Sequence, residues 1–194
     1  MKKNSFLTEI YDLIETILTA FFVVSLILSY CVRMSDVDGP SMENTFHSKE
    51  KVIVLPWERD LSTGDVIVAN TEYAYLLDDD NGIIKKEGLG KTVIKRVIAT
   101  EGQTLDIDFN TGNVTVDGVL LNEPYITGLT HNDEGGFTGQ YPLTVPEGYV
   151  FVMGDNRSVS MDSRSPAIGL VSENRIIGKV VFRFFPFDKI GKIG

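Results

Sequence analysis

Near the start of the chain, apolar residues run almost without interruption. Between Ile10 and Met34 most positions are apolar, and the uncharged part from Thr16 to Val32 is about 17 residues long, just enough for a helix to cross a bilayer. A cleaved secretory signal would have a shorter apolar core followed by small residues, whereas Tyr30-Cys31-Val32-Arg33 stands at this point. The pattern therefore predicts a retained transmembrane anchor over residues 10–34.

Basic residues on the two sides of this span indicate its orientation. Lys2 and Lys3 precede the span and only Arg33 closely follows it, and an excess of basic residues marks the cytoplasmic end of a membrane helix. We therefore expect a single-pass protein of the cell membrane. Residues 1–9 would be a short cytoplasmic N-terminus, and the part after the anchor would lie outside the cytoplasm.

After the anchor, the pattern changes to short β-branched runs separated by turn residues. Lys51–Leu55 and Asp65–Ala69 are two such runs, with a Ser-Thr-Gly turn between them. The chain is therefore predicted to be mainly β, with one transmembrane helix before a β core of residues 35–102 and 147–194. An Asp-Gly hairpin signal and alternating apolar positions predict a small β-subdomain inserted at residues 103–146.

The stretch Thr92–Ala99 carries two basic residues inside apolar stripes. In a strand, alternation would place its central residues on two faces, with Val93, Lys95 and Val97 on one and Ile94, Arg96 and Ile98 on the other. One explanation is that Lys95 reaches solvent at a strand edge. The other is that burial lowers the pKa of Lys95, so that its neutral amine can act as a general base.

A constrained serine stands shortly after the anchor, in the stretch Asp38-Gly39-Pro40-Ser41-Met42-Glu43-Asn44-Thr45. Glycine adopts backbone angles closed to other residues and proline fixes its own φ, so the pair can present Ser41 at a set angle. By itself a Gly-Pro-Ser triplet is an ordinary turn. A serine becomes a nucleophile only with a base within reach. His47 could supply it in a Ser-His-Asp arrangement, but no carboxylate at a recognisable spacing would orient it.

A dense polar segment follows the apolar run Tyr149–Met153. Between Gly154 and Arg164 the chain holds two aspartates, two arginines and several hydroxyl groups. This density predicts a rigid loop with internal Asp-Arg pairing. A purely structural corner is the alternative.

Composition narrows the classes of function. The net charge is −9, and because phosphate binding needs a basic face, a nucleic-acid partner is not expected. Cys31 is the only cysteine and lies in the apolar run, while His47 and His131, the only histidines, have no ligand spacing. We therefore expect neither a metal nor another cofactor.

Four stretches, in this order behind an N-terminal anchor, together resemble the type I bacterial signal peptidases. They are Gly39–Thr45, Gly64–Val68, Ile94–Ile98 and Met153–Arg164. The likeness covers nearly the whole chain and is least convincing over residues 103–146. By size and single anchor, the chain is similar to the compact form of the family.

The resemblance implies a membrane-anchored serine endopeptidase that removes signal peptides from exported preproteins through an acyl-enzyme. Ser41 matches the nucleophile, with its backbone N–H in the oxyanion hole, and Lys95 matches the general base. Ser160 matches the serine that orients this lysine. Further residues match those that hold the site together: Arg96, Asp155, Asp162 and Arg164.

The family's substrates bind as an extended strand with small side chains at the first and third positions before the cut. Here the walls of the groove would be Ser35–Pro40 and Thr92–Lys95, with shallow pockets at Val37 and Ile94. The residues expected to contact substrate are Val37, Asp38, Gly39, Pro40, Met42, Val93 and Ile94. The lipid bilayer would hold both the anchor and the substrate's own apolar segment, which makes their encounter effectively intramolecular.

Three departures from the family pattern affect the expected chemistry. Asn44 stands where many members have proline, and Ala99–Gln103 replaces a Gly-x-Pro-Gly-Asp stretch. Gly39 stands where some members have a hydroxyl group in the oxyanion hole, so stabilisation would rest more on the backbone N–H of Ser41. In other hydrolases, losing one such donor costs about 3 kcal/mol.

Two alternatives stay open at this stage. A Ser-Lys self-cleaving repressor would share the catalytic pair of Ser41 and Lys95, which we call the dyad. Such a repressor would need a DNA-binding domain where this chain has an apolar span. A signal-peptidase-like protein without activity could serve as an assembly partner for surface structures. The presence of Ser41, Lys95 and Ser160 argues against it, whereas Asn44 leaves room for it. The sequence does not indicate an oligomeric state.

Overall fold

The chain divides by its contacts into two units, Met1–Arg33 and Met34–Gly194. The computed structural model describes residues 5–78, 80, 82–133 and 141–193. Lys2 and Lys3, on which the predicted membrane orientation depends, lie outside these residues.

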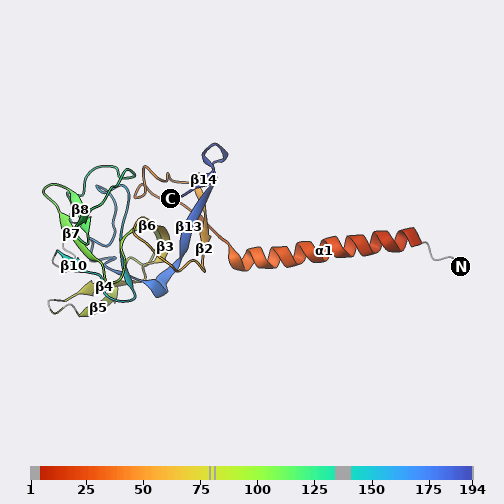
Figure 1. Ribbon diagram of the computed structural model, residues 1–194, viewed down its shortest axis with the longest axis horizontal. Coiled ribbons are helices and arrows are strands. Elements are labelled where there is room, and N and C mark those ends of the chain that lie inside the picture. The colour runs from red at the N-terminus through yellow and green to blue at the C-terminus, as the bar shows by residue number, and fades with distance from the viewer. Residues whose placement is uncertain (1–4, 79, 81, 134–140, 194) are drawn as a thin grey trace. The chain divides into compact units, whose positions relative to one another are not determined.

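In its described part, the first unit is one long helix, α1, over Ser5–Cys31 (Figure 1). The segment Leu7–Cys31 is long and apolar enough to cross a membrane, judged by length and composition alone. The helix begins at Ser5 rather than at the predicted Ile10, because no glycine or proline interrupts the residues between them. It ends at Cys31 rather than at Met34, because a strand begins at Arg33.

The second unit is built on β-strands, which confirms the predicted mainly β fold. Its largest sheet has eight strands in the order β1-β2-β13-β3-β6-β11-β12, with β14 paired to β13, beside a four-stranded sheet β10-β7-β8-β9 and a hairpin β4-β5. The bounds are β1 Arg33–Asp36, β2 Lys51–Leu55, β3 Val66–Asn70, β4 Tyr73–Leu77, β5 Ile83–Glu87, β6 Thr92–Ala99, β7 Thr104–Asp108, β8 Asn113–Val116, β9 Val119–Leu120, β10 Leu143–Thr144, β11 Tyr149–Met153, β12 Val171–Ser172, β13 Ile176–Phe185 and β14 Gly191–Lys192, with 3-10 turns η1 Glu173–Arg175 and η2 Phe187–Lys189.

Strand β3 shows why the large sheet is buried on both faces. Val66 and Val68 pack into one hydrophobic cluster, and Ile67 and Ala69 pack into another. Successive side chains of a strand point to opposite faces, so a continuous apolar run is buried on both sides. The buried strand β3 pairs with β6 and so fixes the position of β6, which carries the candidate base.

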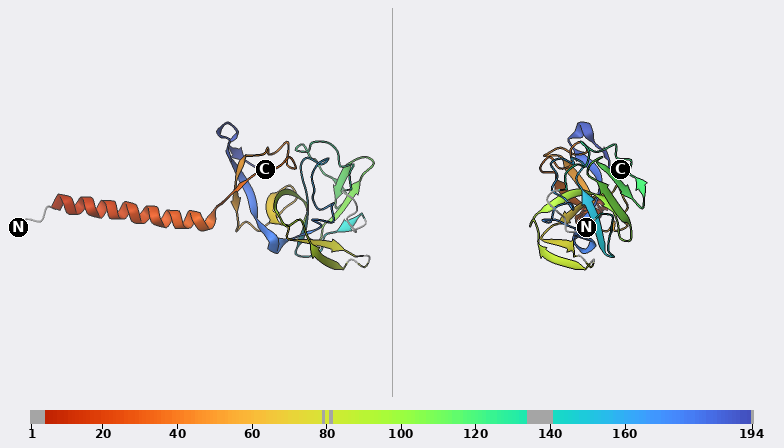
Figure 2. Two further views of the ribbon diagram at one scale, coloured as in Figure 1. Left: turned by 180° about the vertical axis from the view of Figure 1, so that it is seen from behind. Right: turned by 90° about the vertical axis from the view of Figure 1, so that its left-hand side faces the viewer.

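The predicted inserted segment forms a sheet of its own but shares its core. Strands β7 to β10 lie within residues 103–146 and group apart from β2 and β13 (Figures 1 and 2); residues 134–140 of this segment lie outside the described part. Its buried Leu105 and Val114 pack in the same cluster as Phe151 and Met153 of β11. The division into a core and a subdomain therefore stays a prediction.

Strand β6 pairs along different lengths on its two sides. β3 pairs with it over Thr92–Arg96, and β11 pairs with it over Arg96–Ala99. On the β11 side, the segment Thr92–Lys95 pairs with no other strand in the described part of the chain. The backbone of this segment therefore presents a free edge where it approaches Ser41.

Candidate active site

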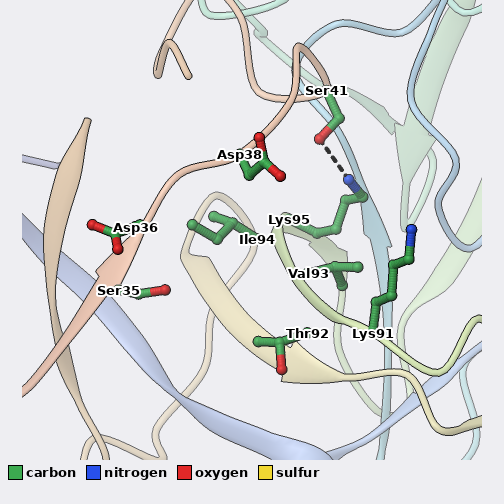
Figure 3. Close-up of a pocket in the computed structure, with 9 residues that line it drawn as sticks. All are labelled: Ser35, Asp36, Asp38, Ser41, Lys91, Thr92, Val93, Ile94 and Lys95. Atoms are coloured by element: carbon green, nitrogen blue, oxygen red, sulfur yellow. Dashed lines mark hydrogen bonds between the residues drawn. The ribbon is translucent and has the colours of Figure 1, made fainter. Parts of the chain in front are cut away.

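Ser41 and Lys95 meet, although 54 residues separate them. The Nζ atom of Lys95 donates a hydrogen bond of 2.8 Å to Ser41 Oγ (Figure 3). This distance lies within the range in which a base can take a proton from a nucleophile. His47, the other candidate base, lies at the surface with its Nδ1 3.7 Å from a Glu43 carboxylate oxygen.

Burial prepares Lys95 for the role of a base. The residue is only 4% exposed, although its side chain carries an amine. The pKa of Lys95 falls from 10.5 to about 8, chiefly through loss of water; the carboxylates of Asp162 and Asp155 oppose this fall, and Arg164 adds to it. The neutral amine is therefore a minor but far larger fraction near neutral pH than in an exposed lysine. Of the two explanations for Lys95, the structure supports burial over a position at the solvent edge.

The backbone around Ser41 depends on two glycines. Gly39 has a φ of +84°, a conformation that disfavours other residues. Gly154 lies so close that an added Cβ would be 2.4 Å from the carbonyl oxygen of Ser41 and 2.2 Å from Ser160 Oγ. The neighbouring Asn156 N–H donates a 3.0 Å hydrogen bond to the same carbonyl of Ser41. A side chain at Gly154 would push these two segments apart.

Arg96 and Asp155 form a buried ion pair next to the dyad. Arg96 donates from Nε to Asp155 Oδ1 at 2.8 Å and from Nη2 to Asp155 Oδ2 at 2.7 Å, which is a bidentate pair. Thr45 Oγ1 donates to Asp155 Oδ2 at 2.5 Å and accepts from Arg96 Nη2 at 3.2 Å. The pair is thus tied by a side chain to the segment that carries Ser41.

A second ion pair shapes the loop after β11. Arg164 Nε donates to Asp162 Oδ1 at 2.8 Å, and the Gly154 N–H donates to Asp162 Oδ2 at 2.9 Å. Both partners of the pair are fully buried. Arg164 also donates from Nη2 to the carbonyl oxygens of Arg157 and Ser160. The predicted internal Asp-Arg pairing of this loop is therefore present.

Ser160 is buried beside this pair, but its hydroxyl does not orient Lys95 here. Among the described residues, Ser160 Oγ has no hydrogen-bond partner. Lys95 Nζ donates to Ser41 instead. The contact implied by the resemblance is absent from this arrangement, and the role of Ser160 stays a prediction.

A cavity of about 290 Å³ opens beside the dyad (Figure 3). Its walls come from the segment before Ser41 and from the free edge of β6, and the Lys95 side chain reaches across to Ser41 in the figure. The lining residues are Ser35, Asp36, Asp38, Ser41, Lys91, Thr92, Val93, Ile94 and Lys95.

Three of the seven residues expected to contact substrate line this cavity, namely Asp38, Val93 and Ile94. Gly39 and Pro40 are not among the lining residues. Val37 and Met42 are only 4% and 1% exposed and pack into a hydrophobic core cluster, and their contact with substrate stays a prediction. The chain turns at Gly39 and Pro40, so strand alternation does not predict which side chains face the groove.

Residues that the sequence did not single out also contact the site. The ring of Tyr125 stacks on Arg96, with its centroid 3.9 Å from the guanidinium carbon. Thr127 donates from its backbone N–H to the Asp155 carbonyl at 2.8 Å and from Oγ1 to the Glu43 carbonyl at 3.2 Å. Both lie in a stretch without a recognisable motif. Nothing in the local pattern indicated these contacts.

Arg157 secures the same stretch from the other side. It is fully buried and forms an ion pair with Glu123, and it donates to Thr130 Oγ1 at 2.7 Å. Within the described residues, no group of three or more histidine, cysteine, aspartate and glutamate side chains could hold a metal ion.

Comparisons with known proteins show the family to which the chain belongs. The sequence pattern of one family, described as signal peptidase, peptidase S26, matches residues 10–185. The chain is 31% identical to signal peptidase I of Bacillus licheniformis, over 98% of this chain and 95% of that protein. It is 33% identical to signal peptidase I P of Bacillus subtilis subsp. natto, over 94% and 93%. A solved signal peptidase I from Enterococcus faecalis V583 is 27% identical, with a TM-score of 0.42 over 62% of this chain and 96% of that chain.

Proposed function

We propose that this chain, which belongs to the signal peptidase family (peptidase S26), is a serine endopeptidase that removes signal peptides from exported preproteins. The observation that carries the proposal is the 2.8 Å hydrogen bond between Lys95 Nζ and Ser41 Oγ, made by a lysine that is 4% exposed. A buried lysine beside a serine suits nucleophilic catalysis without a histidine. No finding favours the alternative of an inactive assembly partner.

The reaction would proceed in two halves. In the first, neutral Lys95 takes the proton from Ser41 Oγ as this oxygen attacks the scissile carbonyl, and it then passes the proton to the leaving amine. In the second half, Lys95 takes a proton from a water molecule that attacks the acyl-enzyme, and it returns that proton to Ser41. The signal peptide leaves with a new carboxylate, and no metal or cofactor enters the reaction.

The backbone N–H of Ser41 is the proposed oxyanion donor. Among the residues that the structure describes, this N–H has no acceptor, so it is available to the developing negative charge. Gly39 supplies no side-chain donor there.

The free edge of β6 is the proposed docking site for the substrate strand. Between Thr92 and Lys95, backbone groups on the β11 side have no strand partner in the described chain, and an extended peptide can add to such an edge. Ile94 and Val93 line the cavity there and would leave room for small side chains. Val37 contributes only from within the core.

The other residues of the site are proposed to position the dyad. Arg96 and Asp155 hold the turn that carries Ser41, while Asp162 and Arg164 fix the loop over Lys95. Ser160 would orient the Lys95 amine when this amine is not bonded to Ser41. The support for these roles is the burial of all five side chains.

The apolar helix is proposed to anchor the protein in the lipid bilayer with a cytoplasmic N-terminus. Its length and composition support the anchor, and the basic residues before it support the orientation. Within Met34–Gly194, we propose a catalytic core of residues 35–102 and 147–194 and a small subdomain of residues 103–146. Substrate and enzyme would then meet at the outer face of one membrane.

The experiment that tests the function is a cleavage assay with the detergent-solubilised full chain. We expect a preprotein with alanine at the first and third positions before its cleavage site to be cut at that site. A preprotein with large side chains at both positions is the control and should stay intact. If the preprotein with alanine at both positions also stays intact, the proposed function is contradicted.

The pH dependence of cleavage tests the role of Lys95. With the pKa of Lys95 at about 8 in the free protein, kcat/KM should rise about tenfold per pH unit below this value and level off above it, because only the neutral amine accepts a proton. The free energy of unfolding should also rise with pH between about 8 and 10.5, where the unfolded chain binds more protons than the folded one. An inflection of kcat/KM near 10.5, the ordinary pKa of lysine, would contradict this role.

A further inference from the structure

The turn Ser41–Thr45, which we call the nucleophile turn, is held at three alternate carbonyl groups. The carbonyl oxygen of Ser41 accepts from Asn156 N–H at 3.0 Å, that of Glu43 from Thr127 Oγ1 at 3.2 Å, and that of Thr45 from Arg183 Nη1 at 2.8 Å. These donors come from three separate parts of the chain. The one from Arg183 is both the shortest and partly buried, whereas the bond from Thr127 is exposed to water.

The side chain of Arg183 is also held by contacts outside the nucleophile turn. Its Nη1 also donates to Glu50 Oε2 at 2.9 Å, and its Nε donates to the Lys189 carbonyl at 2.9 Å. The guanidinium carbon lies 5.8 Å from the centre of the Phe46 ring. The arginine is 20% exposed in its side chain. Its position is therefore determined by contacts on several sides.

Glu50 connects this arginine to the other end of the segment that carries Ser41. The carboxylate of Glu50 is 4% exposed in its side chain, and its backbone carbonyl accepts a 2.8 Å hydrogen bond from Val37 N–H. Lys49 N–H donates in turn to the Val37 carbonyl at 2.8 Å. Residues 37 and 49–50 are thus hydrogen-bonded to each other at the two ends of the segment that carries Ser41, and the ion pair of Glu50 and Arg183 holds the segment at this point.

Thr45 contacts both Arg183 of this ion pair and the ion pair of Arg96 and Asp155 beside the dyad. Its hydroxyl contacts Asp155 and Arg96, and its carbonyl contacts Arg183. Loss of the bond to Arg183 would leave the backbone of Thr45 without this donor and hold the residue through its hydroxyl group instead. Small displacements of a nucleophile cost rate steeply, about a hundredfold for 1 Å.

We propose that Arg183, held by Glu50, is a positioning residue for Ser41. It touches neither substrate nor the reacting atoms and acts through the carbonyl of Thr45. This inference rests on the proposed nucleophile, Ser41, and it adds two residues that lie outside the motifs shared with the family. Arg183 lies on β13 and Glu50 directly precedes β2.

The test is Arg183→Met in the detergent-solubilised full chain, with Arg183→Lys as the conservative variant. We expect kcat to fall about tenfold in Arg183→Met, as for the loss of one charge-assisted hydrogen bond, with KM changed less than about twofold. Arg183→Lys should restore part of the rate, because an ammonium group can still donate. The inflection of kcat/KM at about pH 8 should not move, since the environment of Lys95 is unchanged.

A matched control is Arg175→Met. This change removes an exposed ion pair with Glu72, at 3.1 Å, in η1, and it should leave kcat as it is. If Arg183→Met lowers only the melting temperature and cleaves at the wild-type rate well below it, Arg183 is merely structural and the proposal is overturned. Equal losses of kcat in both variants would overturn it as well.

Labelling with a serine-directed fluorophosphonate separates this inference from the proposed function. We expect the probe to react with Ser41 in the absence of a preprotein, and the rate of this labelling to fall about tenfold in Arg183→Met and stay unchanged in Arg175→Met. If the wild type is labelled but cuts no preprotein, the proposed function fails while the positioning role stands. If labelling is equally fast in wild type and Arg183→Met, the positioning role fails.

Discussion

Lys95→Met should abolish preprotein cleavage by the purified protein while leaving the fold intact. The methionine side chain is of similar length but cannot accept a proton, so Ser41 keeps its own proton and stays a poor nucleophile. General-base catalysis alone contributes up to about ten-thousandfold, and we expect kcat/KM to fall at least about a thousandfold. The measurement is the cleavage of one preprotein under conditions of enzyme excess, with the wild type alongside.

The same variant should be more stable than the wild type near pH 7. Folding buries the Lys95 amine at the expense of its hydration, which is why its pKa falls from 10.5 to about 8. Methionine carries no such penalty in an apolar site. A raised melting temperature together with lost activity would mark Lys95 as a residue retained for chemistry and not for stability.

Two further variants complete this test. Lys95→Arg should be inactive as well, because guanidinium does not lose its proton in this pH range. Ser41→Ala should be as inactive as Lys95→Met, and the double variant no worse than either, because residues that act as one unit are not additive. Appreciable cleavage by Lys95→Met would remove the proposed mechanism.

The dyad could be predicted because each of its residues stands in a short stretch whose pattern indicates its local structure. Gly39-Pro40 marks a turn that presents Ser41, and alternation along Thr92–Ala99 makes Lys95 conspicuous. Whether Lys95 is buried could not be decided from that stretch. Its burial depends on what packs over β6, including the loop of Asp155 and Asp162 that follows β11.

The side chains that face the groove were harder to predict. Val37 and Met42 lie close to Ser41 in sequence, yet both point into the core. Alternation applies only within a strand, and β1 ends at Asp36. Beyond that point the direction of each side chain depends on the turn, which sequence spacing does not encode.

Contacts between distant segments were not accessible from the sequence at all. Arg183 donates to the carbonyl of Thr45 although the two residues are 138 positions apart in the sequence. The ring of Tyr125 contacts Arg96 from the stretch with the weakest likeness to the family. Each residue looks like an ordinary strand or loop residue in its own surroundings. The proximity of Arg183 to the segment before β2 follows from the sheet topology, since β13 pairs with β2.

Asp155→Asn should lower the free energy of unfolding by about 3–5 kcal/mol, the cost of leaving one partner of a buried ion pair without its counter-charge. Arg96 would keep its guanidinium, which is 1% exposed. Its remaining acceptors would be the Gly64 carbonyl and Thr45 Oγ1, at 2.7 and 3.2 Å, and the single amide oxygen left at position 155. Urea denaturation of the detergent-solubilised full chain, with the wild type in parallel, measures the change.

Asp36→Asn is the matched control for this prediction. Asp36 pairs with Lys51 at 2.7 Å, the same distance as Arg96 Nη2 to Asp155 Oδ2, but its side chain is 71% exposed. Exposed pairs contribute about 1 kcal/mol or less, so the same substitution should barely change the midpoint there. A similar loss in both variants would show that burial does not decide the strength of these pairs. The ion pair of Arg96 and Asp155 would then not be what stabilises the contact between the nucleophile turn and the loop after β11.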